Sequence, residues 1–210
     1  NTDSQTLLSE DLVRLLSAWT DFRQTASCTS DFTLEASLGN LSLDETIRYA
    51  QTFVDGRKIT CIRMGDLSIY GSGGIFCDAS GARLTEAETG LAHRIHLLEV
   101  LHQICLNGTF DCVETGNDTW LYTLTLDKAA MEKILIAAAP DAEFLSGVLT
   151  SGSVQLRLKD GAISEIDCGC TGGPDAQAAF SVKLVLTQTE GFEVPAEVLA
   201  QLCEEGGEAS

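Results

Sequence analysis

Hydrophobic side chains recur at every second position over much of this sequence. From Phe32 to Ala36 apolar residues alternate with polar ones, and the same period runs through a longer segment from Leu41 to Phe53. Strict alternation places one set of side chains on a single face of a β-strand. The Gly39-Asn40 pair between the two segments is typical of a hairpin turn, so the sequence predicts two antiparallel strands here.

The same alternation predicts eight further strands, most of them bounded by glycine, aspartate or asparagine turns. They are expected around residues 58–64, 67–70, 75–77, 110–115, 120–126, 154–158, 163–170 and 180–186. Every link from one strand directly to the next is short enough for an antiparallel connection. One large antiparallel sheet of about ten strands is therefore predicted.

Apolar residues at helical spacing interrupt this pattern in four segments. The predicted helices cover residues 11–22, 85–106, 127–139 and 195–202. Asp127 is a capping residue before the third helix, and Pro140 ends that helix because proline cannot continue it. Pro195 stands at the first position of the last helix, where proline is favoured.

The second helix has the most clearly marked ends. Thr85 and Glu88 form a capping box at its start, and Asn107-Gly108 ends it. At 100° per residue, its apolar side chains fall on one stripe together with a single histidine. This stripe consists of Leu91, Ile95, Leu98, Leu101, His102 and Cys105. We expect it to face the sheet.

These elements predict an α+β fold in a single domain over residues 1–210. A sheet that is apolar on one parity must cover that face, either by closing on itself or by holding helices in its concave side. Because helices are available, we expect a large curved antiparallel β-sheet, an open half-barrel, with helices packed on its concave face. Such an arrangement leaves a lined cavity wherever the packing is incomplete.

Charge narrows the classes of partner. The chain has 31 acidic against 13 basic residues and a formal net charge of −18. Such a molecule repels phosphate backbones and anionic lipid surfaces, so nucleic acid is excluded as a partner. No apolar run approaches the roughly 20 residues of a membrane span, and the sequence opens on polar residues. A soluble chain is expected, attached to a membrane only through a lipid anchor that this sequence does not carry.

Eight cysteines leave three interpretations open. An oxidising compartment with up to four disulfides is one, and buried free thiols that act as small hydrophobic side chains are another. Cys105 and Cys112 flank a short Asn-Gly turn and are the predicted local bridge. The third interpretation is zinc bound by Cys168 and Cys170, but the usual spacing and a second cysteine pair are missing, so no metal site is predicted.

No catalytic motif is recognisable, and neither an enzyme nor a cofactor is expected. The Gly71 to Gly74 run lacks the lysine and the helix of a phosphate-binding loop. His93 and His96 are expected to face solvent, whereas His102 lies within the apolar stripe and is either a core residue or part of a cavity wall. The residues predicted to line a cavity, with simple core packing as the alternative, are Tyr49, Leu98, Leu101, His102, Trp120 and Tyr122.

The order of elements resembles a known group of proteins. The segments that carry the likeness are 120–126 before a helix, 152–161 across a strand and its turn, and 192–195 at the end of the sheet. Together they resemble bacterial lipoproteins of the LolA and LppX type. The resemblance implies an open half-barrel over helices, an apolar cavity for acyl chains, and a position outside the cytoplasmic membrane. Two features depart from that group: no lipidation cysteine lies near the N-terminus, and the many cysteines are not part of its pattern.

Two functional hypotheses follow. The first is an extracytoplasmic binding or carrier domain, monomeric, secreted or lipid-anchored at the cell surface, for a hydrophobic small molecule or lipid. The alternative is a structural or protein-interaction module of the cell surface with a fully packed concave face and no ligand cavity. Cavity volume distinguishes them, since ligand sites commonly enclose about 300 to 1,000 Å³.

Overall fold

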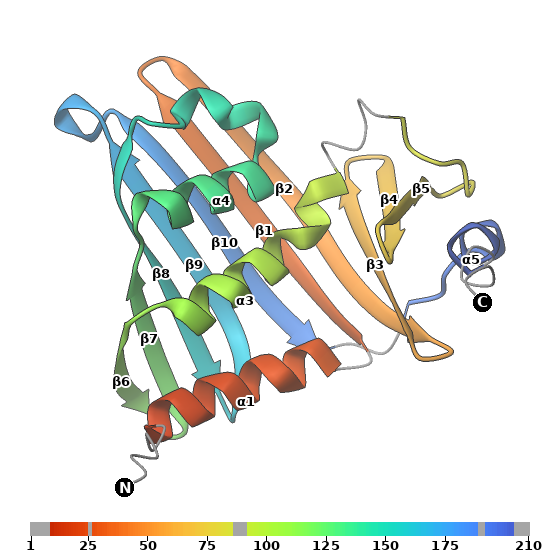
Figure 1. Cartoon of the computed structure of the whole chain (residues 1–210), viewed down its shortest axis with the longest axis horizontal. Helices are drawn as coiled ribbons and strands as arrows, with labels where there is room; N and C mark the ends of the chain where they lie inside the picture. The colour runs from red at the N-terminus through yellow and green to blue at the C-terminus, as the bar shows by residue number, and fades with distance from the viewer. Residues whose placement is uncertain (1–8, 25–26, 86–91, 189–191, 204–210) are drawn as a thin grey trace, which may run out of the picture.

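The structure is a computed structural model that describes residues 9–24, 27–85, 92–188 and 192–203. Ten strands form one antiparallel sheet (Figure 1). Their bounds are β1 Ser27–Leu38, β2 Leu41–Val54, β3 Arg57–Met64, β4 Leu67–Ser72, β5 Ile75–Asp78, β6 Phe110–Gly116, β7 Thr119–Thr125, β8 Leu149–Lys159, β9 Ala162–Gly172 and β10 Ala178–Gln188. The predicted fold class, a curved antiparallel sheet with helices on its concave face, is confirmed.

The α-helices of the described residues lie in segments that the sequence predicts as helical, but within the predicted helix 85–106 one α-helix begins only at Leu97, after a 3₁₀ helix at His93–His96. They are α1 Glu10–Gln24, α3 Leu97–Asn107, α4 Lys128–Ala138 and α5 Ala196–Cys203, with short 3₁₀ helices η1 His93–His96, η2 Pro140–Leu145 and η3 Pro174–Ala176. The side chain of Asp127 accepts a hydrogen bond from the Ala130 N–H, which caps α4 as predicted. No helix among these residues is both long enough and apolar enough to span a bilayer.

The strands lie in the order β5-β4-β3-β2-β1-β10-β9-β8-β7-β6. Two meanders therefore meet where β1 pairs with β10, with Phe32 opposite Leu184. The first meander runs from β1 to β5 and the second from β6 to β10. The first and the last strand of the chain therefore lie side by side in the middle of the sheet.

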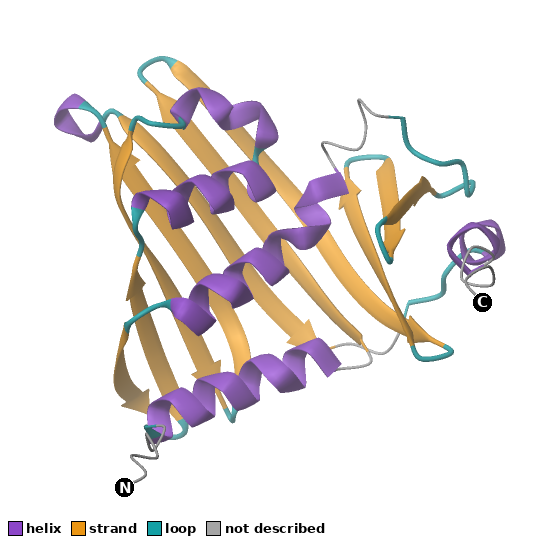
Figure 2. Cartoon of the chain, viewed as in Figure 1, coloured by secondary structure: helices purple, strands orange, loops and turns teal. Residues whose placement is uncertain are grey.

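Three helices cover one face of the sheet. In Figure 2, α1, α3 and α4 cross the strands one after another along the strand direction. The inward positions of the strands and the predicted stripe of α3 supply the core between them: Ile95, Leu98, Leu101, His102 and Cys105 are all buried. Leu91 and Glu88, which the sequence placed in the same helix, lie outside the described residues. The stripe faces the sheet as expected.

The fourth helix, α5, packs elsewhere. It covers the outer face of β3 to β5, where Ile59, Tyr70 and Cys77 are buried against Val198 and Leu202. Because successive side chains of a strand point to opposite faces, β3 is buried on both sides at its centre. The sequence predicted this helix but not the surface that it covers.

The predicted disulfide between Cys105 and Cys112 is wrong, since both thiols are free in the structure. Cys105 points from α3 into the core beside Trp19, where burial raises the pKa of its thiol to about 12. Cys112 lies on β6, opposite Tyr122 of β7. The turn brings the two backbones close, but the helix and the strand direct their side chains to different neighbours.

Candidate functional site

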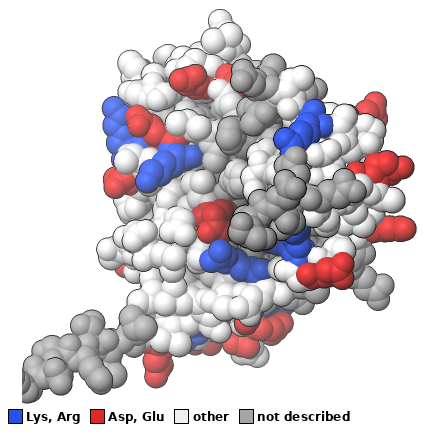
Figure 3. Space-filling model, turned by 45° about the vertical axis from the view of Figure 1, so that its right-hand side comes forward, with Lys and Arg blue, Asp and Glu red and all other residues white. Residues whose placement is uncertain are grey.

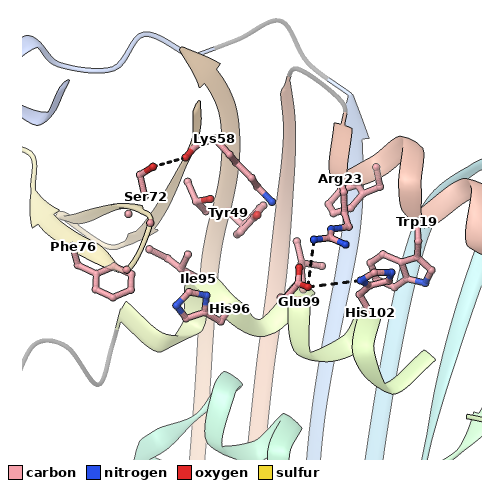
Figure 4. A pocket seen from close by; sticks show the side chains of 16 residues that line it. Trp19, Arg23, Tyr49, Lys58, Ser72, Phe76, Ile95, His96, Glu99 and His102 are labelled. Atoms are coloured by element: carbon pink, nitrogen blue, oxygen red, sulfur yellow. Dashed lines mark hydrogen bonds and ion pairs between the residues drawn. The ribbon is translucent and has the colours of Figure 1, made fainter. Parts of the chain in front are cut away.

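A cavity of about 200 Å³ lies on the concave face at the end of the sheet where β2 to β5 meet α1 and α3. Its walls are largely aromatic and aliphatic, as Figure 4 shows. The apolar residues that line it are Trp19 and Phe22 of α1, Tyr49 of β2, Phe76 of β5, and Ile95 and Leu98 beside α3. We call this the aromatic cavity. It lies beneath α3, the helix that contains His102.

A row of small or polar residues explains why the face is hollow here. Gln51, Thr60 and Gly71 lie opposite one another across β2, β3 and β4. Gln51 is fully buried, and its side-chain amide donates to the Phe22 carbonyl at 3.0 Å. Thr60 and Gly71 line the cavity, and a Cβ added at Gly71 would lie 2.9 Å from the Phe76 ring and 3.1 Å from Ile95 Cδ1. The small residues therefore admit these neighbours, which form the wall of the cavity.

Charged groups stand at the rim of the aromatic cavity. Arg23, at the end of α1, pairs with Glu99 of α3 at 3.5 Å. Lys58 lies on the opposite side, where its carbonyl accepts a hydrogen bond from the Ser72 hydroxyl at 2.8 Å (Figure 4). The rim thus carries charges of both signs, and acidic and basic side chains are also interspersed over the face shown in Figure 3. The cavity thus combines an apolar interior with a polar mouth.

His102 forms part of the wall of the aromatic cavity. Its ring lies 5.1 Å from the Trp19 ring, and burial is the main cause that lowers the pKa of the imidazole, with the nearby Arg23 charge adding to it. Its Nδ1 atom is 3.9 Å from Glu99 Oε1 and has no hydrogen-bond partner within the described chain. His102 therefore brings a polar group to the cavity wall.

A second hollow runs between α3 and α4. This groove has a volume of about 490 Å³ and is open to solvent along the surface. Leu124 and Leu126 form its floor, and Val100 and Ile104 line its α3 side. Ala129 and Ala130 of α4 line the other side. We call it the helix groove.

The structure brings together some of the predicted cavity residues and separates the others. Tyr49, Leu98 and His102 line the aromatic cavity. Leu101 is fully buried in the packed core instead. Trp120 and Tyr122 lie on β7, beside the other end of α1, where the Arg14 guanidinium stacks 3.6 Å above the Trp120 ring centroid. The Tyr122 hydroxyl donates to the Asp11 carbonyl at 2.8 Å, which makes this tyrosine an anchor for α1.

Trp19 and Phe76 are cavity residues that sequence reasoning missed. The apolar spacing of residues 11–22 did mark Trp19 as a buried helix position, and it is 1% exposed. Its place beside His102 depends on how α1 crosses the strands, which the pattern does not reveal. Phe76 lies on the last strand of the first meander, and its ring meets His96 edge-on at 5.8 Å. The side chain of His93 is outside the described set, whereas His96 is exposed as predicted.

Arg94 is a fully buried cation that no sequence motif indicated. Its Nη2 atom lies 2.6 Å from Glu45 Oε2 on β2, and its Nε donates to the Ala138 carbonyl at the end of α4 at 2.9 Å. Nη1 approaches the Met64 sulfur at 2.9 Å. This one side chain therefore ties the start of α3 to the sheet and to α4.

The thiols do not form a metal centre within the described part of the chain. No cluster of three or more His, Cys, Asp or Glu side chains could hold an ion there. Cys168 and Cys170 are neighbours on the inward face of β9 and are both buried. Their mutual interaction raises the pKa of the Cys168 thiol and lowers that of Cys170. Both residues pack as small hydrophobic side chains, the second of the interpretations left open by the sequence.

Comparisons with known proteins find likeness in structure only. No protein-family model matches the chain, and no curated protein matches it. The lipoprotein LppX of Mycobacterium tuberculosis is 14% identical with a TM-score of 0.42, over 89% of this chain and 100% of that one. LprF from Mycobacterium bovis is 11% identical, also with a TM-score of 0.42, over 88% of this chain and 95% of its own. A LolA superfamily protein from Nitrosomonas europaea is 8% identical with a TM-score of 0.35, over 91% and 97%. Proteins of the LolA and LppX type, which the sequence resembles, are thus among the structures similar to this chain.

Proposed function

We propose that this chain is an extracytoplasmic binding or carrier domain for a hydrophobic ligand, such as a lipid or an acyl chain. The ligand inserts an apolar end into the aromatic cavity. The observation that carries the proposal is the pairing of a hollow, aromatic-lined space with a polar rim on the concave face of the sheet. Globular cores rarely retain such voids, because each one forfeits packing contacts.

The size of the cavity limits what enters it. A volume of about 200 Å³ lies below the range of about 300 to 1,000 Å³ that whole-ligand sites commonly enclose. A cavity of about 150 Å³ suffices for a benzene ring in a small protein core, so this one accommodates a ring or a short length of acyl chain. It is too small for a whole lipid. The ligand therefore inserts only part of itself.

The rim favours an amphipathic ligand. Arg23, Glu99 and Lys58 supply charges of both signs at the mouth, next to an interior built from Trp19 and Phe76. A polar headgroup remains hydrated at such a mouth while the apolar end leaves water. Each methylene transferred in this way contributes about 0.8 kcal/mol. The Nδ1 atom of His102, without a hydrogen-bond partner in the described chain, offers a polar contact inside the wall.

One observation favours the alternative, a cell-surface structural or protein-interaction module. Most of the concave face is solid: Tyr122, Leu156, Ile166 and Leu184 are all 0% exposed. In this alternative the aromatic cavity is a packing defect and the acidic exterior performs the function. We propose a monomer outside the cytoplasmic membrane in either case, and ligand binding distinguishes the two.

Tryptophan fluorescence tests the proposal because the chain has two tryptophans and only Trp19 lines the cavity. In a Trp120→Phe variant, Trp19 is the sole tryptophan. Titration with a doxyl-labelled stearic acid is expected to quench its emission saturably. Trp120 serves as the internal control, since a Trp19→Phe variant should show no saturable quenching. Equal quenching of both tryptophans would contradict the proposal.

A matched pair of filling variants tests the site itself. Thr60→Phe adds a ring at an inward lining position of the cavity on β3, and Thr123→Phe adds a ring on β7 away from it. Both threonines lie within strands of the same sheet. Thr60→Phe is expected to weaken binding about tenfold or more, while Thr123→Phe leaves it within about twofold. If the two variants bind alike, the alternative module is the better account.

A further inference from the structure

Helix α3 forms a wall of two hollows, one on each side. Leu98 and His102 face the aromatic cavity, whereas Val100, Gln103 and Ile104 face the helix groove. Residues two positions apart on a helix point in nearly opposite directions, about 200° apart. Neighbouring residues of α3 can therefore line hollows on opposite sides of the helix. The helix is thus the partition between them.

The two hollows meet at one place. His96 and Glu99, at the start of α3, border both the aromatic cavity and the helix groove. His96 is exposed and packs edge-on against Phe76 at 5.8 Å, and Glu99 is held by Arg23 at 3.5 Å. Both side chains are therefore positioned by contacts on the cavity side. The crest between the hollows is polar, while the space on either side of it is apolar.

The helix groove has an apolar floor suited to an acyl chain, with Asn107, Asp127 and Lys133 as polar residues at its edges. Its floor consists of Leu124 and Leu126, which are buried, and its α4 side is kept low by Ala129 and Ala130. Gly108 closes the packing of α3 on this floor, since an added Cβ would lie 2.7 Å from a Leu124 methyl group. With about 490 Å³, the groove has more than twice the volume of the aromatic cavity. It takes the longer apolar segment.

We infer that the aromatic cavity and the helix groove bind the two apolar arms of one amphiphile, whose polar junction sits over His96 and Glu99. This inference rests on the proposed function and deepens it, because it assigns the ligand to the class of two-chain lipids. One arm enters the cavity on the Leu98 side of α3, and the other lies in the groove on the Ile104 side.

A single long chain that bends over α3 fits the same space less well. It would have to place methylenes against the imidazole of His96 and the carboxylate of Glu99, at the point where the two hollows meet. Apolar groups at a charged, solvated crest gain no burial and displace water from the charges. A two-chain ligand instead places its own polar junction there. The pattern apolar–polar–apolar across α3 matches that of the ligand.

Two soluble lipids that differ by one chain test the inference. Isothermal titration with dioctanoyl phosphatidylcholine and with its single-chain octanoyl lyso analogue, each below its micelle concentration, compares the two classes. A zwitterionic headgroup avoids repulsion by the net charge of −18. The two-chain lipid is expected to bind at least about tenfold more tightly, since each buried methylene contributes about fourfold in affinity.

Filling the helix groove should remove the tighter binding of the two-chain lipid without weakening binding of the single-chain lipid. Ala129→Phe places a ring in the helix groove, and Ala200→Phe places the same ring on α5, at another exposed helical alanine. Ala129→Phe is expected to bring the two-chain lipid down to the affinity of the lyso lipid and to leave the latter within about twofold, while Ala200→Phe changes neither.

The possible failures are distinguishable. If the wild-type chain binds both lipids equally, the two-arm inference is overturned and the proposed function stands. If Ala129→Phe weakens both lipids alike, the groove is not a separate arm site and the inference is likewise overturned. If neither lipid binds the wild-type chain, both the proposed function and this inference fail.

Discussion

The two halves of the concave face are built from the same alternating pattern, yet one is solid and the other is hollow. In the solid half, Tyr122, Leu156, Ile166 and Leu184 lie opposite one another across β7, β8, β9 and β10, each of them 0% exposed. In the hollow half, the row beside the aromatic cavity is Gln51, Thr60 and Gly71 across β2, β3 and β4. The two rows lie at different heights along the strands, because Leu184 pairs with Phe32 and Phe32 pairs with Ile47 of β2.

The difference teaches that side-chain volume, rather than polarity pattern, decides where this sheet keeps a cavity. Large aliphatic residues at inward positions fill the space up to the helices, because protein interiors pack at the density of organic crystals. At Gly71 the Phe76 ring and Ile95 occupy the place of a side chain, and with Trp19 they line what remains of the space as the aromatic cavity. The helix groove, in contrast, lies over Leu124 of β7, in the solid half. Each half therefore borders one of the two hollows.

Truncation should cost most in the solid half. Leu156→Ala is expected to lower the free energy of unfolding by about 3 to 4 kcal/mol, because it opens a cavity in a region with no spare volume. Leu98→Ala, beside the existing cavity, should cost at most about 2 kcal/mol, since fewer contacts surround that side chain. Urea unfolding of both variants measures the difference. Equal losses would show that the two halves are packed alike.

Arg94 joins β2 to the end of α4, and its removal should have the next largest effect. Arg94→Ala leaves Glu45 and the Ala138 carbonyl without their buried partner. We expect a loss of about 2 to 3 kcal/mol, below the range for a fully buried ion pair because the Glu45 side chain is 32% exposed.

The double variant Arg94→Met with Glu45→Gln provides the comparison for that loss. It removes both charges and retains most of the volume, so it should be more stable than Arg94→Ala in the same urea experiment. A double variant that is no more stable would indicate that Arg94 acts by packing and not through its charge.

Filling the hollow half by a single carbon should have a modest effect. An added Cβ at Gly71 would lie 2.9 Å from the Phe76 ring and 3.1 Å from Ile95 Cδ1. Gly71→Ala is therefore expected to cost about 1 kcal/mol in thermal or urea unfolding and to weaken ligand binding severalfold. Gly169→Ala on β9 is the matched control, because an added Cβ there meets nothing within 4 Å. It should leave both quantities unchanged.

The smallest expected effect is the pH dependence that His102 contributes. Its folded pKa lies below the ordinary value of 6.5, so the unfolded chain binds the proton more readily. The stability from the neutral imidazole is present above about pH 6.5 and is lost as the pH falls through the lower folded pKa. Unfolding free energies measured from pH 8 to pH 5 should therefore decline less steeply in His102→Phe than in the wild type. Identical slopes would show that the imidazole is not desolvated.

Much of this architecture could be predicted from the residues in order. The period of two from Phe32 to Leu186 predicts the strands and their apolar face, and the turns at Gly39, Asp55-Gly56 and Asp160-Gly161 set their limits. The stripe of α3, with His102 in it, predicts which face of that helix meets the sheet. Such signals are legible because they depend on neighbours a few positions apart, and secondary structure is largely a local property.

Only the tertiary structure decided where the hollow lies and which residues surround it. Pairing of β1 with β10 places Phe32 opposite Leu184, although they stand far apart in the chain, and the crossing of α1 brings Trp19 to His102. Burial of Arg94 depends on Glu45 and Ala138 arriving from two other elements. A cavity forms where several elements enclose more space than their side chains fill. The enclosed space depends on elements that are distant in the sequence, so no short segment of the sequence reveals it.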